Sequence, residues 1–189
     1  MQKLPCEITP CEITMKRKSG EEKTFVFRQC TQEDVDAIVA LQDAVYAALP
    51  DDTIFVKTNR DEFIESIDLD YCFCFMDGDV MAAFTLMVSG RMGYRNYGEY
   101  LDYDEERMLK TVCMDTSFVL PEYRGFGLQD YFFRYREKVA KEAGATEALT
   151  TIAPHNEYSL NNAYKSGYEE VRRMSIYGGI DRIILRKIF

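Results

Sequence analysis

Long apolar segments are missing from this sequence. The longest one, residues 81–88, is interrupted by Thr85 and is far shorter than the roughly 20 residues that cross a bilayer. No charged start followed by an apolar run resembles a secretory signal peptide. We therefore expect a cytoplasmic protein that has no membrane partner.

Histidine and positive charge are also scarce. His155 is the single histidine, and Cys72 and Cys74 form the one close cysteine pair, so the chain lacks a set of zinc ligands and we expect no metal site. Lysine and arginine total 23 against 32 acidic residues, which gives a net charge of −9. Because nucleic acid binding needs a positive surface, nucleic acid is not an expected partner. A small basic or neutral molecule fits this charge better.

The composition is otherwise that of a globular protein. Apolar residues make up 47% of the chain and charged residues 29%, which is enough for one folded domain. A tandem repeat of Pro-Cys-Glu-Ile-Thr occupies residues 5–14, and a basic segment that reads like the start of a chain follows it. We divide the chain into an N-terminal extension, residues 1–21, and a domain, residues 22–189. We further expect residues 1–14 to be dispensable for folding.

Hydrophobic periodicity predicts the elements of this domain. The expected strands are residues 24–28, 71–75, 80–88, 112–120, 148–152, 168–177 and 181–188. The expected helices are residues 35–49, 59–67, a segment between Pro121 and Gly144, and residues 156–165, while residues 89–108 form a long loop rich in glycine, tyrosine and acidic side chains. This order predicts an α/β (α+β) fold with a single mixed, twisted sheet of about six to seven strands and helices on both faces.

The most informative segment joins a strand to a helix through a glycine-rich turn, at residues 117–130. The first amides of a helix have no internal acceptor, and the helix dipole makes that end positive. Gly125 and Gly127 let a phosphate approach the main chain, and Arg124 adds a positive charge beside it. A dinucleotide-binding fingerprint would need glycine where Asp130 stands, and no Gly-Lys-Ser/Thr ending typical of a P-loop is present.

A second motif lies downstream, at residues 156–168, and the two motifs together resemble those of the GNAT superfamily of acyl-CoA-dependent N-acyltransferases. In that family the turn reads Gln/Arg-x-x-Gly-x-Gly/Ala, and an Asn-x-x-Ser helix that ends in Gly-Phe follows about thirty residues later. The matching residues are Arg124, Gly127 and Gln129 in the turn, and Asn156, Ser159, Gly167 and Tyr168 in the helix. Element order extends the resemblance over roughly residues 24–189.

The resemblance implies a GNAT-like fold and acetyl-CoA as cosubstrate. The pantetheine arm would enter between the strand that ends at Leu120 and the strand that ends at Ile152. Asp130 is expected to point outward, as a carboxylate at a helix start. The implied cofactor-binding residues are Ser117, Phe118, Val119, Arg124, Gly125, Phe126, Gly127, Leu128, Gln129, Asp130, Asn156 and Ser159.

Two residues are candidates for catalysis. Tyr164 is the candidate acid for the departing thiolate, although the family position falls one residue earlier, on Ala163. Asp115 is the candidate base, because strand alternation places it on one face with Cys113, Ser117 and Val119, opposite the face that carries Val112, Met114, Phe118 and Leu120. Cys113 as a nucleophile would need a lowered pKa, and no cation is evident near it. If Tyr164 does not act, water or another tyrosine protonates the thiolate.

The acceptor amine is not named by the sequence. The acidic and aromatic residues 99–106 are open to two interpretations, a negative rim that attracts an ammonium group or a solvated helix start before Met108. We predict an N-acetyltransferase that acts on a small-molecule or peptide amine and is a monomer or homodimer. The alternatives left open are an acyl-CoA-binding sensor of the same fold and a protein-interaction module that uses the tyrosine-rich loop.

Overall fold

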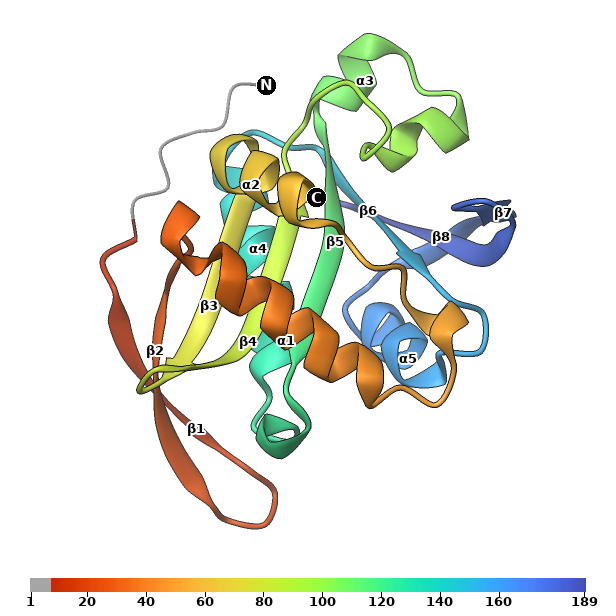
Figure 1. Ribbon diagram of the computed structural model, residues 1–189. Coiled ribbons are helices and arrows are strands. Elements are labelled where there is room, and N and C mark those ends of the chain that lie inside the picture. Colours follow the sequence, from red (N-terminus) through yellow and green to blue (C-terminus); the bar gives the residue numbers. More distant parts are fainter. Residues whose placement is uncertain (1–7) are drawn as a thin grey trace.

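The computed structural model describes residues 8–189, which form one eight-stranded mixed sheet with helices on both faces (Figure 1). The strands are β1 (Cys11–Lys16), β2 (Glu22–Gln29), β3 (Tyr71–Asp77), β4 (Val80–Val88), β5 (Thr111–Val119), β6 (Glu147–Ile152), β7 (Glu169–Ile176) and β8 (Ile180–Ile188). The α-helices are α1 (Val35–Ala47), α2 (Arg60–Leu69), α3 (Glu105–Leu109), α4 (Leu128–Glu142) and α5 (Glu157–Lys165). The expected fold class is confirmed, with one strand more than expected.

The strand order is β1-β2-β3-β4-β5-β6-β8-β7. Within the described chain, every neighbouring pair is antiparallel except β5 and β6, which run parallel. A parallel pair needs a crossover connection, and α4 supplies it on the back of the sheet in Figure 1. The single parallel pair therefore lies where the glycine-rich turn leads from β5 into α4.

The additional strand is β1, which lies inside the segment predicted as an extension. Its residues pair in order with β2, with Ile13 opposite Phe25, and Ile13 and Met15 pack against the core beneath the hairpin. The sheet thus begins at Cys11, in the second copy of the repeat. Most of the first copy lies outside the described residues, and the dispensability of residues 1–14 remains a prediction.

Two apolar clusters fill the two sides of the sheet. One joins the phenylalanines of β2 and β3 to Phe132 and Val139 of α4 and to Leu160 and Ala163 of α5. The other joins α1 and α2 to the opposite face, where Phe63 meets Phe84 with ring centroids 5.7 Å apart. Each helix buries one apolar stripe, so the sheet is covered on both faces and its edges remain open.

Capping residues mark where these helices begin. Asn59 caps α2 and forms a capping box with Glu62, while the box of Thr31 and Asp34 opens the short 3₁₀ turn η1 (Gln32–Asp34) that leads into α1. Further 3₁₀ turns are η2 (Asp52–Ile54), η3 (Tyr97–Leu101) and η4 (Pro121–Tyr123). Along residues 8–189, no helix has the length and apolar character needed to cross a membrane.

Candidate functional site

A groove with a volume of about 1030 Å³ runs between the diverging parts of β5 and β6. The two strands pair only where Thr111–Cys113 meets Glu147–Leu149. Thr150 marks the end of this pairing, since its Oγ1 donates to the carbonyl oxygen of Met114 at 2.8 Å. Beyond it β5 follows β4 and β6 follows β8, so residues 114–119 and 150–153 line opposite sides of the groove. These are the two strands between which the pantetheine arm was expected to enter.

The turn from β5 into α4 lines the same groove with main-chain donors. Gly125 and Gly127 have φ values of 89° and 80°, in the left-handed region that glycine adopts at little cost. The first amide of α4 with an acceptor is that of Tyr131, which donates to the carbonyl oxygen of Gly127 at 3.0 Å. Within the described part of the chain, the amides of residues 125–130 have no hydrogen-bond acceptor. Unpaired amides at a helix start form a site for an anion.

The hairpin of β1 and β2 brings positive side chains to this turn. Arg17 donates through Nε to the carbonyl oxygen of Arg124 at 3.1 Å and through Nη2 to that of Glu122, and its guanidinium lies 4.3 Å from the ring centre of Phe126. Because a trans peptide directs its N–H opposite its C=O, the amide of Gly125 points away from Arg17. Arg17 and Lys18 both line the groove. Arg17 and Lys18 were not named as binding residues from the sequence. The basic segment that contains them, in a chain that is otherwise acidic, could have indicated them.

Most of the predicted cofactor-binding residues line the groove together. They are Ser117, Phe118, Val119, Arg124, Gly125, Gly127, Leu128, Gln129, Asp130, Asn156 and Ser159. Phe126 differs, because its side chain is buried against Phe25 and beneath Arg17. Asp130 is exposed and pairs with Arg134 one helical turn away, as expected for a carboxylate at the start of α4.

The start of α5 forms one wall of the groove. Asn156 caps the helix by accepting from the amide of Ser159 at 3.2 Å, and Asn162 donates to Gln129 of α4 at 3.3 Å. Ser159 and Asn162 are three residues apart and share the face that lines the groove.

Tyr164 does not belong to this wall. Two residues beyond Asn162 correspond to about 200° around a helix, and Tyr164 is accordingly 43% exposed and absent from the groove lining. Ala163, at the family position, is buried. The position of Tyr164 therefore argues against its assignment as the acid that protonates the thiolate.

A β-bulge interrupts β5 at the candidate base. Ser117 is opposite Thr85 and Met114 is opposite Met87, so Asp115 and Thr116 together face the single residue Leu86. Because β5 has one extra residue here, each later side chain of β5 points to the opposite face of the sheet from the one that alternation predicts. Met114 packs in the cluster on the α4 side and Phe118 in the cluster on the α1 side, so the predicted common face of these two residues is wrong.

Arg136 of α4 contacts β4 opposite the bulge. Its buried guanidinium donates through Nη1 to the carbonyl oxygen of Leu86 at 3.0 Å, opposite the bulge. Burial lowers the pKa of Arg136 to about 10. The bulge is thus supported from the α4 side. Asp115 lies on the same side of β5 as Cys113, as alternation predicts, because Tyr97 contacts both residues.

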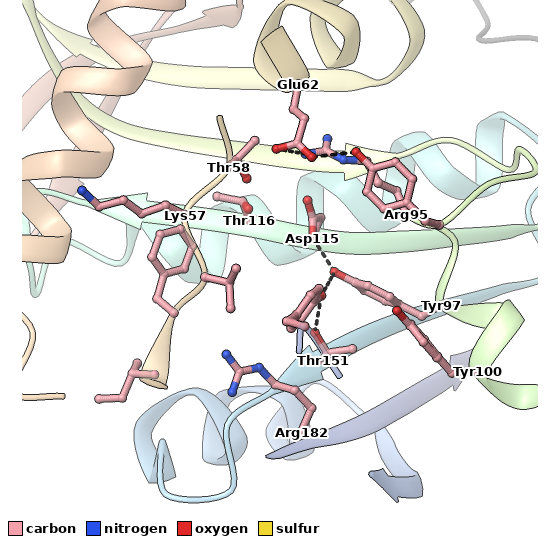
Figure 2. A pocket seen from close by; sticks show the side chains of 15 residues that line it. Lys57, Thr58, Glu62, Arg95, Tyr97, Tyr100, Asp115, Thr116, Thr151 and Arg182 are labelled. Carbon is pink, nitrogen blue, oxygen red and sulfur yellow. Dashed lines mark hydrogen bonds and ion pairs between the residues drawn. The ribbon is translucent and has the colours of Figure 1, made fainter. Parts of the chain in front are cut away.

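A second cavity of about 240 Å³ adjoins the groove (Figure 2). Its lining comes from residues 54–58, from Glu62, from the segment before and within η3, from β5 and β6, and from the hairpin of β7 and β8. Ile54, Phe55, Asp115, Thr116 and Thr151 line both spaces. Asp115 therefore stands where the two spaces meet.

Asp115 is held by a chain of hydroxyl groups. The hydroxyl of Tyr97 donates to Asp115 Oδ1, and that of Tyr177 donates to Tyr97 at 3.2 Å (Figure 2). Withdrawal from bulk water raises the pKa of Asp115, although the positive charge of Arg95 and the hydrogen bond from Tyr97 oppose the shift. Burial likewise raises the pKa of Tyr177 to about 12. The hydroxyls of Tyr97 and Tyr177 act as donors, and the raised pKa makes the carboxylate of Asp115 more basic than an exposed one.

The segment 89–101 positions the polar groups of the cavity. Asn96 donates to the carbonyl oxygens of Arg91 and Met108, both at 2.9 Å, and accepts from the amide of Gly98 at 3.0 Å. These bonds fix the main chain between Arg95 and Tyr97, whose side chains line the cavity. Sequence reasoning treated this segment as a loop and singled out neither residue.

The acidic residues of this region lie elsewhere. Asp104 caps α3, Asp102 pairs with Arg172, and Glu106 pairs with Lys110. From residues 99–106, only Tyr100 lines the cavity. The helix-start interpretation of the acidic segment is confirmed, and the negative rim is not formed around this cavity.

Cys113 is not placed for nucleophilic chemistry. It is buried and its sulfur accepts from the amide of Tyr97 at 3.3 Å. Burial raises the pKa of its thiol, which disfavours the thiolate. Cys72 and Cys74 are buried in β3, within the cluster beneath α1 and α2.

Comparisons with known proteins bear on the fold. A scan of protein-family models and a search of curated protein sequences found no match. Solved structures do match, among them the acetyltransferase of GNAT family from Streptococcus pneumoniae, with a TM-score of 0.65, 13% identity, and coverage of 87% of this chain and 99% of that one. The chain has the fold of the GNAT acetyltransferases.

Two further structures of the GNAT fold were solved with a bound cofactor. PaiA N-acetyltransferase from Thermoplasma acidophilum, in complex with coenzyme A, matches with a TM-score of 0.63 and 13% identity over 88% of this chain and 100% of that one. YncA from Salmonella typhimurium, with its cofactor acetyl-CoA, matches with a TM-score of 0.62 and 18% identity over 87% and 93% of the two chains. At these identities the likeness concerns the fold.

Proposed function

We propose that this protein is an N-acetyltransferase that transfers the acetyl group of acetyl-CoA to a primary amine. The observation that carries the proposal is a groove with unpaired main-chain amides at residues 125–130 that leads to Asp115, where a second cavity begins. Support comes from the matching fold, whose solved examples are acetyltransferases, some of them with CoA or acetyl-CoA.

The cofactor would be held mainly by main-chain atoms. The amides of residues 125–130 would bind the pyrophosphate, beside Arg124 and Lys18, neither of which has an ion pair within the described chain. The main chain of Ser117–Val119 borders the open side of β5 and offers hydrogen-bonding groups to the pantetheine arm, as an edge strand does. Asn156 and Ser159 would contact the same arm from α5.

The chemistry would take place where the groove meets the cavity. Bound acetyl-CoA supplies a thioester as acyl donor. Asp115 would accept the proton that the amine loses, and a main-chain amide near Val119 would stabilise the negative charge that develops on the carbonyl oxygen. An N–C bond forms as the C–S bond breaks, and water in the open groove protonates the departing thiolate. A carboxylate with a raised pKa is better suited to this role than an ordinary one.

One observation favours a second candidate function. Tyr164 lies outside the groove, so the protein lacks a tyrosine acid at or beside the family position. A domain that binds acyl-CoA as a sensor without transferring the acyl group would need the groove and not the acid. This candidate predicts CoA binding without release of free thiol in the presence of any amine.

Binding of CoA is the first test. Calorimetric titration and the melting temperature should both register CoA, because a ligand bound to the native state alone stabilises it. Gly127→Glu should abolish both signals by placing a charged side chain among the amides. The matched control is Gly144→Glu, since Gly144 has the same φ of 80° but ends α4 away from the groove. Equal CoA affinity of the two variants would contradict the proposed site.

Transfer is tested separately, by following thiol release from acetyl-CoA with a panel of amines. Release with any amine supports the transferase, and intact CoA binding with no release across the panel supports the sensor. Absence of CoA binding would contradict both and would favour an interaction module.

A further inference from the structure

Arg182 of β8 is a buried positive charge without an opposite charge beside it. Its side chain lines the second cavity (Figure 2), and the residue is only 3% exposed. Nη1 donates to the main-chain oxygen of the adjacent Asp181 at 2.9 Å, and within residues 8–189 no ion pair joins Arg182 to a carboxylate. Burying a charge is costly unless it is paired, so the remaining donors of this guanidinium call for an anionic partner.

The other charged groups of the cavity already have partners. Lys57 pairs with Asp43 outside the cavity at 2.8 Å. Glu62 accepts from the hydroxyl of Tyr94 at 2.6 Å and lies 3.8 Å from Arg95. Asp115 accepts from Tyr97 and faces the charge of Arg95.

Among these groups, Arg182 is left without a counter-charge. Beside it the cavity wall consists of Tyr97, Tyr100 and Tyr177, and the guanidinium of Arg182 lies 5.7 Å from the ring centre of Tyr177. These tyrosines supply apolar surface and hydroxyl groups, and none of them supplies a negative charge at neutral pH.

We propose that the acceptor is a small amino-carboxylate, of the amino-acid class, whose carboxylate pairs with Arg182 while its amino group lies at Asp115. This rests on the proposed acetyl transfer and names its substrate class. A guanidinium presents a planar pair of donors that matches a carboxylate, which an ammonium group does not. A cavity of about 240 Å³ is in the range of a small molecule. The carboxylate takes no part in the bond changes and serves to orient the amine.

The charges argue against the other acceptor classes. A polyamine would bring a second positive charge toward Arg182, where repulsion is weakly screened, and a lysine side chain would bring no counter-charge to it. A simple amine would leave Arg182 unpaired in the complex as well. An amino acid supplies one charge of each sign, and Asp115 and Arg182 both line the cavity (Figure 2).

The test compares amines that differ only in a carboxylate. The standard amino acids are assayed beside the amines that lack their α-carboxylate, such as tyrosine with tyramine and lysine with cadaverine. Wild-type protein should prefer the amino-carboxylate in kcat/KM by at least about tenfold. Arg182→Gln should raise KM for the amino-carboxylate by about tenfold or more, with a smaller change in kcat and no change for the matched amine. Equal use of both members of each pair by wild-type protein would overturn the proposal.

Two further variants separate pairing from folding. Arg182→Lys keeps the charge and should give an intermediate KM, and Arg173→Gln removes an exposed arginine of the same hairpin and should change nothing. Melting temperatures identify any variant that fails to fold. Retained preference for the carboxylate in a folded Arg182→Gln variant would contradict the role of Arg182.

A binding measurement keeps this question apart from that of transfer. The CoA-bound protein is titrated calorimetrically with amino acids and with the matched amines. Heat that depends on the carboxylate and is lost in Arg182→Gln supports the acceptor class, even if no thiol is released. Intact CoA binding with no heat from any amino-carboxylate overturns the acceptor class and leaves CoA binding unaffected.

Discussion

The groove and the cavity that meet at Asp115 are built in different ways. The groove has unpaired main-chain amides at residues 125–130 and borders the main chain of residues 114–119. The cavity takes its polar groups from side chains that are far apart in sequence, as the hydrogen bond between Tyr97 and Tyr177 across 80 positions illustrates. A main-chain site tolerates changes of sequence that a side-chain site does not. The general part of the proposed reaction is therefore found in the groove, and the part that selects a substrate in the cavity.

Charge distinguishes the two regions as well. At the glycine-rich turn the groove is lined by the positive side chains of Arg17, Lys18 and Arg124, and the carboxylate of Asp130 there pairs with Arg134, although the protein as a whole has a net charge of −9. The cavity holds both signs, with Asp115 and Glu62 opposite arginine side chains. This difference matches a ligand of several negative charges in the groove and a ligand of mixed charge in the cavity.

The largest effect is expected from Asp115→Asn, which alters the point where the groove and the cavity meet and leaves the glycine-rich turn unchanged. Turnover should fall about 100-fold or more, as for loss of a general base, while CoA affinity remains unchanged. In the wild-type protein kcat should decrease as the pH is lowered through the raised pKa of Asp115, because the protonated carboxyl cannot accept a proton. That acid limb should be absent from the variant. Thiol release measured across pH, with calorimetry of CoA binding, checks both points, and turnover within a few-fold of wild type would exclude Asp115 as the base.

A smaller effect is expected from Arg17→Gln, which acts on the groove alone. Loss of the bonds to the carbonyl oxygens of Glu122 and Arg124 frees the turn and removes a positive charge, so the Kd for CoA should rise by roughly five- to tenfold, about 1 kcal/mol. Lys16→Gln is the control, because Lys16 is exposed and pairs with Glu22 on the same hairpin. A Kd that is equal for the two variants would show that the hairpin does not support the turn.

Tyr97→Phe should change the pH dependence more than the rate. The hydroxyl of Tyr97 stabilises the charged form of Asp115, so its removal should raise the pKa of Asp115 further and move the acid limb of kcat to higher pH. Tyr177→Phe removes the next hydroxyl in the chain and should move the limb less. The two pH profiles measure this difference, and an unchanged limb in Tyr97→Phe would mean that Asp115 does not set it.

The smallest effect is expected from Tyr164→Phe. Tyr164 is exposed and lies outside both spaces, so turnover and CoA affinity should both stay within about twofold of wild type. A selective loss of kcat in this variant, at constant CoA affinity, would restore Tyr164 as the acid. Thiol release from acetyl-CoA, measured with the same amine for the variant and the wild-type protein, checks this prediction.

Local patterns predicted most of the secondary structure, and they were least accurate where pairing partners matter. The segment of β1 alternates weakly and sits inside a repeat, so its place in the sheet depends on its pairing with β2. The bulge in β5 has no signature in the alternation from Val112 to Leu120, because it is defined by register against β4. Tyr164 stands one residue after the family position. On a helix one residue turns the side chain by about 100°, so Tyr164 lies outside the groove.

The glycine-rich turn could be located from the amino-acid order because its chemistry is local. Two glycines and a following helix leave consecutive amides without acceptors in any fold that preserves them. The cavity could not be located in this way. The burial of Arg182, its lack of an ion pair within residues 8–189 and its place in the same cavity as Asp115 depend on contacts between segments that only the folded sheet brings together. Short-range geometry thus indicated a site for an anion, and long-range packing decided which charged side chains line the cavity beside it.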